Sequence, residues 1–320
     1  MLDPLSEVLR SLRLTGGVFL DVHCTAPWCV LSELTADDCR PFLAKPAQLI
    51  CYHVVLQGSL LIEIDGEPSM SVVAGEIVLL PRNDVHKVAS ALGLQPVPAH
   101  SLVQPSLVGG LGRVVHGGAG DLTHLVCGFL GTEDDHSPLL AVLPRLLKLD
   151  LRQGTTRDWV EASVRFAASE LAEGRLASSS VMSRLSEVLL VEAVRHYAAT
   201  LGDRDTGWIK GLGDPQVGRA MALMHDGISV AWTAEALARA VAMSRSAFTE
   251  RFTNLVGMPP IRYLTMWRLQ SARLQLRETA RSVGQIAHAV GYESEEAVSR
   301  AFQREVGASP ARWRSEHQPA

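Results

Sequence analysis

Residues 245–263 read RSAFTERFTNLVGMPPIRY, and residues 294–313 read SEEAVSRAFQREVGASPARW. Both segments place bulky apolar residues one helical turn apart, followed by a glycine, a proline and an aromatic residue in the same order. Before the segments, residues 237, 238, 241 and 243 match residues 49 positions later in the chain. Inside the segments, residues 248, 252, 257, 260 and 263 match residues 50 positions later. Agreement at nine positions indicates two copies of one supersecondary unit, with one extra residue in the turn of the second copy.

Each copy combines a short apolar helix, a tight turn and a second helix. Ser244 and Ser294 stand where the second helices begin, and serine is a favoured N-cap residue. Two short helices joined in this way predict a helix-turn-helix motif, whose second helix enters a DNA major groove. The longer helix predicted over residues 259–279 would set the separation of the two motifs. The alternative is an internally duplicated helical bundle that binds no DNA.

The second helix of each copy carries side chains that DNA binding uses. Arginine, serine and threonine contact phosphates or base edges, whereas a carboxylate repels phosphates but accepts from cytosine N4. We expect the second motif to make fewer specific contacts with bases, because the glutamates Glu295 and Glu296 stand at the start of its second helix. The predicted DNA-binding residues are Arg245, Ser246, Thr249, Arg251, Glu295, Ser299, Arg300 and Arg304.

Charge is unevenly distributed along the chain. From Pro215 to the end there are 13 arginines, no lysine and 9 acidic residues, a net charge of +4, which leaves −8 for residues 1–214. A basic C-terminal part on an acidic body is consistent with binding to a polyanion.

The blocks IAHAVGYES and SRAFQREVGASP, together with Trp313, resemble the AraC/XylS family of bacterial transcription regulators. The resemblance implies a seven-helix DNA-binding domain, usually behind an N-terminal effector or dimerisation domain.

The N-terminal part is predicted to be a β-sandwich or jelly-roll barrel. Short alternating apolar runs between residues 15 and 130 are bounded by glycine and proline, and residues 93–120 are expected to form a long surface loop. From Pro138 the apolar spacing becomes helical. We therefore expect an α+β multidomain chain: a cupin-like sensing domain over 1–133, a helical linker or dimerisation region over 134–206, and the DNA-binding domain over 207–320. The middle helices either dimerise or pack on their own barrel.

The barrel segment GEIVLLPRNDVH resembles the second cupin motif, with Gly75, Pro81 and His86 at the required spacing. Asn83 and Ser90 replace the glycine and asparagine of that motif. In the first motif Cys51 occupies the glutamate position and no His-x-His precedes it, so the usual cupin metal site is not intact. Residues 15–130 also resemble the cupin-type sensor domains of AraC regulators, which implies a sensory role.

Several barrel residues are candidates for a signal-receiving site. Cys51 and His53 share one strand face, and His86 and Cys127 come from other predicted strands. Thiolate and imidazole are zinc ligands, so we expect a Zn²⁺ site, with a small organic effector as the fallback. An oxidant acting on cysteines, with Cys24 and Cys29 as further redox candidates, is a second hypothesis. Purely structural, hydrogen-bonded histidines are the third.

These observations predict a one-component transcription regulator, not an enzyme, in which the barrel senses a signal and the C-terminal domain binds promoter DNA. A cupin enzyme with a fused helical domain and a constitutive architectural DNA-binding protein are the alternatives. The expected partners are promoter DNA, a second copy of the chain, the effector, and RNA polymerase if the protein activates transcription. The sequence shows no signal peptide or membrane span, so we expect a cytoplasmic, nucleoid-associated protein.

Overall fold

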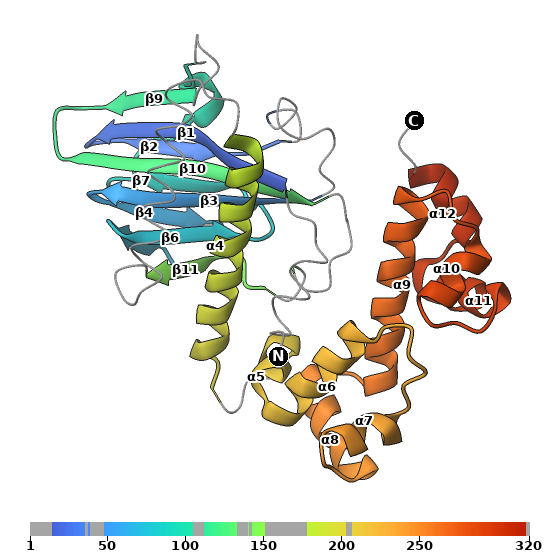
Figure 1. Ribbon diagram of the computed structural model, residues 1–320. Helices are drawn as coiled ribbons and strands as arrows, with labels where there is room; N and C mark the ends of the chain where they lie inside the picture. The colour runs from blue at the N-terminus through green and yellow to red at the C-terminus, as the bar shows by residue number, and fades with distance from the viewer. Residues whose placement is uncertain are drawn as a thin grey trace. The chain divides into compact units, whose positions relative to one another are not determined.

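The computed structural model describes residues 15–35, 38, 48–104, 112–132, 140, 143–150, 178–202 and 207–317. Contacts divide the chain into one unit made of Leu9–Thr200 and another that contains Leu201–Ala320. The first unit is built on β-sheets and the second is helical (Figure 1).

The first unit is a sandwich of two sheets. One sheet has the strand order β11-β6-β3-β10-β1-β9, and the other has the order β5-β4-β7-β2-β8. Apolar side chains from both sheets form one core, which confirms the predicted sandwich. The strand bounds are β1 Thr15–Thr25, β2 Cys29–Ser32, β3 Gln48–Gln57, β4 Ser59–Ile64, β5 Met70–Val73, β6 Glu76–Leu80, β7 His86–Ala89, β8 Val97–Pro98, β9 Gly112–Gly117, β10 Leu122–Thr132 and β11 Leu147–Asp150.

Helix α4 (Ser178–Thr200) packs against β1, β10 and β11 of the six-stranded sheet, and Figure 1 shows it lying across that sheet. Its side chains Leu190, Ala193 and Val194 are buried. Strand β3 is buried along most of its length, which matches its nearly continuous apolar sequence. Helix α4 confirms the helical spacing predicted from Pro138 onward at the end of the middle region, while residues 151–177 of that region lie outside the described residues.

Two predictions for this unit are wrong. Residues 93–120, expected to be a loop, contain β8, a short 3₁₀ helix at Ala99–Ser101 and β9, which pairs in parallel with β1. Only Val114 of β9 is well buried, so the sequence of this strand lacks the alternating apolar pattern from which a strand is predicted. Residues 147–150, expected to be helical, form β11 and pair with β6 because Leu147 and Leu149 alternate toward buried positions.

The second unit contains α5 to α12, with the two predicted motifs in place at α7–α8 and α10–α11. Ser244 and Ser294 cap α8 and α11 as expected. The turns contain Ala242 and Gly291 at matching left-handed positions, so the extra residue of the second copy lies between Gly291 and Ser294. The helix bounds are α5 Trp208–Gly213, α6 Pro215–Asp226, α7 Ala234–Ala240, α8 Arg245–Val256, α9 Pro260–Glu278, α10 Val283–Ala289, α11 Glu295–Val306 and α12 Pro310–His317.

Candidate functional site: DNA-reading helices and a histidine–cysteine cluster

Helix α8 buries one face and exposes the other. Phe248 and Phe252 are fully buried, whereas Arg245 and Ser246 are exposed and Thr249 is half-buried. The aromatic pair anchors the helix in the first half of the domain, so the opposite face is available to a ligand. This is the arrangement predicted for a recognition helix.

Arg251, a predicted DNA contact on α8, also has a partner within the protein. Its Nε donates to Oδ2 of Asp214 over 3.0 Å, and its Nη2 donates to the same oxygen. Asp214 in turn caps α6 by accepting from the amides of Gln216 and Val217. Burial raises the pKa of Asp214, but the hydrogen bonds from Arg251 and the amides outweigh burial and leave that pKa below its usual value. The pair therefore ties α8 to α6, a connection that no sequence pattern indicated.

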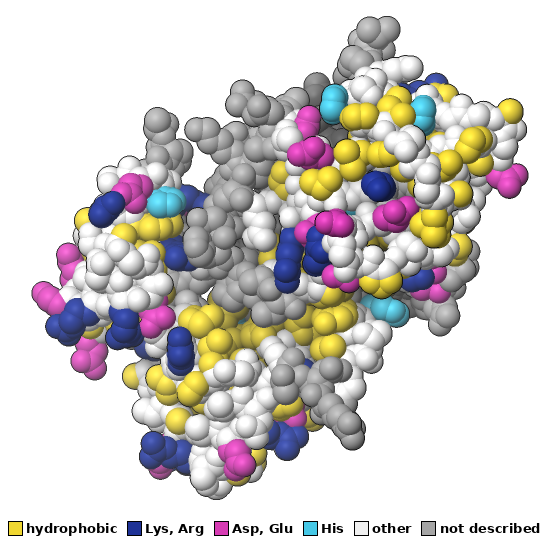
Figure 2. All heavy atoms as spheres, turned by 180° about the vertical axis from the view of Figure 1, so that it is seen from behind, with side chains coloured by type: hydrophobic (Ala, Val, Ile, Leu, Met, Phe, Trp, Pro, Cys, Tyr) yellow, Lys and Arg dark blue, Asp and Glu magenta, His cyan; other side chains and the backbone are white. Residues whose placement is uncertain are grey.

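Helix α11 presents Arg300 and Arg304 on its exposed side, with Ser299 half-buried beside them. Arg304 donates from Nε to Glu305 over 3.0 Å in a largely exposed pair. Glu295 and Glu296 lie in the first turn, where carboxylates interact favourably with the helix dipole. Their position gives these acids a role in starting the helix. On the face seen in Figure 2, basic side chains are interspersed with acidic ones rather than gathered in one continuous patch.

The barrel interior holds the second group of predicted residues. Cys51 and His53 lie two apart on β3, His86 opens β7, and Cys127 lies opposite His53 on β10. His53 Nε2 is 2.7 Å from His86 Nε2, His53 Nδ1 is 2.9 Å from Cys127 Sγ, and Cys51 Sγ is 3.8 Å from His53 Nε2. The structure thus brings together all four predicted effector candidates.

The hydrogen bonds assign the protons of this cluster. His86 Nδ1 donates to the carbonyl of Asp84 over 2.8 Å, so its Nε2 is left as an acceptor. His53 must then donate from Nε2 to His86, and its Nδ1 accepts from the Cys127 thiol. The result is a chain of donors that runs in one direction, from Cys127 to Asp84.

Burial keeps the members of this chain uncharged. Loss of solvation lowers the pKa of His53 well below its usual value, and the neighbouring His86 lowers it further. Burial also lowers the pKa of His86, although the Asp84 carbonyl opposes the shift. For the Cys127 thiol, burial raises the pKa well above its usual value. Both imidazoles are therefore neutral at physiological pH, the form that binds metal ions.

Cys51, His53 and His86 fit a transition-metal site. One ligand atom from each lies within 4.8 Å of the others, and all three residues are buried. Two imidazoles and one thiol are donors that Zn²⁺ accepts, and three protein ligands leave one tetrahedral position open. Tetrahedral zinc places two nitrogen ligands about 3.4 Å apart, so the 2.7 Å separation of the histidines is that of the hydrogen-bonded pair.

The redox candidates Cys24 and Cys29 are buried thiols. Burial raises the pKa of Cys24 to about 11, and burial also raises the pKa of Cys29. Cys24, Cys29, Cys51 and Cys127 form no disulfide. Since the thiolate is the reactive form, these environments disfavour fast oxidation at Cys24 and Cys29.

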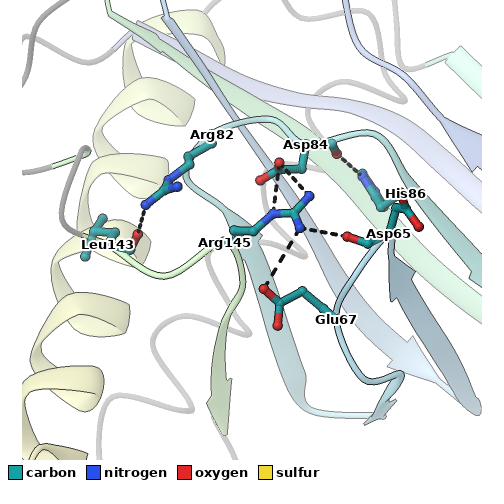
Figure 3. A network of polar contacts seen from close by, with 7 residues as sticks. All are labelled: Asp65, Glu67, Arg82, Asp84, His86, Leu143 and Arg145. Carbon is teal, nitrogen blue, oxygen red and sulfur yellow. Dashed lines mark hydrogen bonds and ion pairs between the residues drawn. The ribbon is translucent and has the colours of Figure 1, made fainter.

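A polar network fastens the turn that carries His86 (Figure 3). Arg145 donates from Nε and Nη2 to Oδ1 of Asp84, at 3.1 and 2.9 Å, and from Nη1 to the carbonyl of Asp65. Arg82 donates to the carbonyl of Leu143 over 3.0 Å. The residues just before β11 therefore hold the turn whose Asp84 carbonyl orients His86. Arg145 follows this turn by more than 60 residues, and no sequence motif marked it.

Asn83 and Ser90, which replace the glycine and asparagine of the cupin motif, make hydrogen bonds in this turn and beside it. Asn83, at the motif's glycine position, has a left-handed backbone (φ 51°), and asparagine adopts this conformation more readily than most residues. Its Nδ2 also donates to the carbonyl of Leu34 over 2.7 Å. Ser90, at the motif's asparagine position, accepts from the amide of Trp28 over 3.0 Å.

Comparison with known proteins assigns both units. A cupin family model matches residues 3–199, and a helix-turn-helix domain model matches residues 237–316. A putative AraC-like transcription regulator of Streptomyces antibioticus is 29% identical over 99% of this chain and 100% of its own length. One from Streptomyces lividans is 30% identical over 98% of each chain. The DNA-binding domain of AdpA, solved in complex with a target DNA, is 31% identical over 32% of this chain and 92% of that domain, with a TM-score of 0.31.

The fold and these full-length relatives define a DNA-binding transcription regulator rather than a cupin enzyme. The chain belongs to the AraC-type regulators that join an N-terminal cupin domain to a C-terminal helix-turn-helix domain. Among the described residues, no helix is both long and apolar enough to cross a membrane.

Replacing Arg300 or Arg304 with alanine is expected to weaken binding to all DNA sequences alike. Each change is predicted to remove one phosphate contact, so the slope of log K against log salt should fall by about 0.9. Titration of labelled promoter DNA with the full chain at several salt concentrations measures this slope. Gln303→Ala on the same exposed surface is the uncharged control. A change in base preference at one operator position would contradict the phosphate assignment.

Thr249→Val is expected to change base preference, because Ser246 and Thr249 lie one turn apart on the exposed side of α8. The effect should be ~1–3 kcal/mol at one or two adjacent base pairs. Binding to a library of operator variants measures it, with Thr253→Val as the control because the Thr253 hydroxyl is bonded to the Thr249 carbonyl. An equal loss over all operators would rule out base reading by Thr249.

Proposed function

We propose that the barrel is the signal-receiving domain of this regulator and that Cys51, His53 and His86 form its receiving site, with Zn²⁺ as the ligand. The observation that carries this proposal is the convergence of one thiol and two neutral imidazoles in the interior. A buried group of this kind has no counterpart in the DNA-reading helices, and packing alone does not require it.

The cluster has two arrangements that exclude each other. Without a ligand, His53 Nε2 carries the proton and donates to His86. A metal ion held by these residues would require both Nε2 atoms to be unprotonated, so His53 would carry its proton on Nδ1 and donate it to Cys127. Cys51 would release its thiol proton to solvent and serve as a thiolate. A site whose hydrogen bonds reverse on binding has the two states that a switch needs.

Trp28 adds a donor to this interior. Its side chain is 2% exposed and belongs to the same core as Cys51, yet its Nε1 has no hydrogen-bond partner among the described residues. Buried donors are nearly always satisfied, so a ligand or water molecule is expected near this indole. This supports an occupied interior and is compatible with a small organic effector as the fallback.

Contacts within the first unit give the signal a route out of the site. The turn bearing His86 is held by Arg82 and Arg145, which belong to the β6–β7 turn and to the segment before β11. Helix α4 packs on β11 and ends at Thr200, the residue that precedes the helical unit in the sequence. We propose that the state of the site is passed along this route to promoter binding by residues 207–320. Within the region 134–206, β11 and α4 pack on their own sheet. Dimerisation through the rest of this region, in the cytoplasm, remains our proposal, with RNA polymerase as a partner if the protein activates transcription.

Changing His53 and His86 together to alanine is expected to abolish zinc binding and the response to zinc in a promoter-reporter assay. Metal content of the purified full chain and the reporter signal measure the two effects. His100→Ala, an exposed histidine of the same unit, is the control. A normal response together with metal-free purified protein would show that these histidines are structural. If an oxidant were the signal, Cys51→Ser and Cys127→Ser would silence the response while the histidine variant retained it.

Arg145→Met is expected to weaken zinc affinity by about 10- to 100-fold without removing a ligand, because Asp84 and its turn lose their orientation. Competition with a chromophoric zinc chelator measures the affinity. The exposed Arg113→Met on β9 controls for loss of one positive charge. Unchanged affinity in Arg145→Met would mean that the turn holds His86 without this network.

A further inference from the structure

A second cluster of metal-binding side chains lies on the outer face of the six-stranded sheet. Asp21 and His23 come from β1 and His124 comes from β10. Val22 and Cys24 belong to the barrel core, so the alternating residues Asp21 and His23 face outward. His23 pairs directly with His124 across the two strands, which places both imidazoles on that same face.

The three side chains converge on one point. His23 Nε2 is 3.1 Å from Oδ2 of Asp21, and His124 Nε2 is 2.7 Å from Oδ1 of the same carboxylate. The two imidazole rings are stacked, with centroids 4.1 Å apart and planes 14° apart. One ligand atom from each residue lies within 4.8 Å of the others. The side chains of His23, Asp21 and His124 are 28%, 32% and 26% exposed, so solvent reaches the cluster.

We propose that Asp21, His23 and His124 form a second metal site, which binds a divalent d-block ion of the zinc type through two imidazole nitrogens and one carboxylate oxygen. Mg²⁺ and Ca²⁺ prefer oxygen ligands throughout, so two imidazoles select against them. Partial exposure leaves the remaining coordination positions to water or to an outside ligand. The site contains no sulfur ligand, which separates it chemically from the interior cluster.

The site joins two strands that are neighbours only in the folded chain, since His23 and His124 are about 100 residues apart. Bound metal therefore fastens β1 to β10 and stabilises the folded barrel by mass action. The inference does not rest on the proposed signal site, because the two clusters lie on opposite faces of the sheet and share no ligand.

The full chain and its Asp21→Asn and His124→Gln variants are titrated with Zn²⁺ and Co²⁺ against a chromophoric chelator. The wild type is expected to bind one metal equivalent that both variants lose and that His100→Gln retains. A Cys51→Ser chain, whose outer cluster is intact, is expected to keep this equivalent. Its Co²⁺ spectrum should show no thiolate charge-transfer band, and added Zn²⁺ should raise its Tm.

A Cys51→Ser chain that binds no Zn²⁺ would overturn the proposal, whether or not the other variants fold. Equal stoichiometry in the wild type, Asp21→Asn and His124→Gln would also overturn it and would leave the cluster as two histidines bonded to one carboxylate. Failure of the interior site gives a different result: the wild type would lack the thiolate band while the outer equivalent remained.

Discussion

The imidazoles of His53 and His86 are buried in contact with each other, and burial disfavours the positively charged form of each ring because the barrel interior does not solvate charge. His53 and His86 are therefore neutral, and each has one donor nitrogen and one acceptor nitrogen. The Asp84 carbonyl fixes the acceptor of His86, which in turn fixes the proton on His53 and the role of Cys127. Much of the barrel site follows from this constraint, including the need to hold the turn that contains Asp84.

Alternation along two strands gives the six-stranded sheet different chemistry on its two faces. On β1, Val22 and Cys24 enter the core while Asp21 and His23 face outward. On β10, His124 lies outward and Cys127 joins the interior cluster. Because side chains alternate along β10, the odd spacing of His124 and Cys127 places them on opposite faces, and the register shift between His124 and Leu125 affects only the pairing with β3.

Features that depend on local order along the chain are predictable from the sequence. The duplicated motif predicted α7–α8 and α10–α11, and the spacing of Cys51 and His53 predicted a shared strand face. Features that depend on strand register or on distant partners are not predictable in this way. β11 was mistaken for helix because its leucines follow a helix-like run, and the Asp84–Arg145 pair joins residues 61 apart. The cluster of Asp21, His23 and His124 is not predictable from sequence spacing, because only the register of β1 against β10 brings these residues together.

In the helical unit, Arg268 shows why arginine content alone does not identify DNA contacts. This residue of α9 is partly buried and donates to the carbonyls of Ile228 and Val230, while its guanidinium lies 5.8 Å from the ring centre of Tyr292. It therefore connects the segment after α6 with the turn of the second motif. A side chain at Gly291 would meet this guanidinium at 2.7 Å, so glycine there permits the contact as well as the left-handed turn. Because Arg268 and α9 join both motifs, the spacing of α8 and α11 is a property of the folded domain. On the prediction that α8 and α11 both enter the major groove, DNA whose two groove segments do not match that spacing would have to be deformed to engage both helices, and the free energy of that deformation would add to operator selectivity.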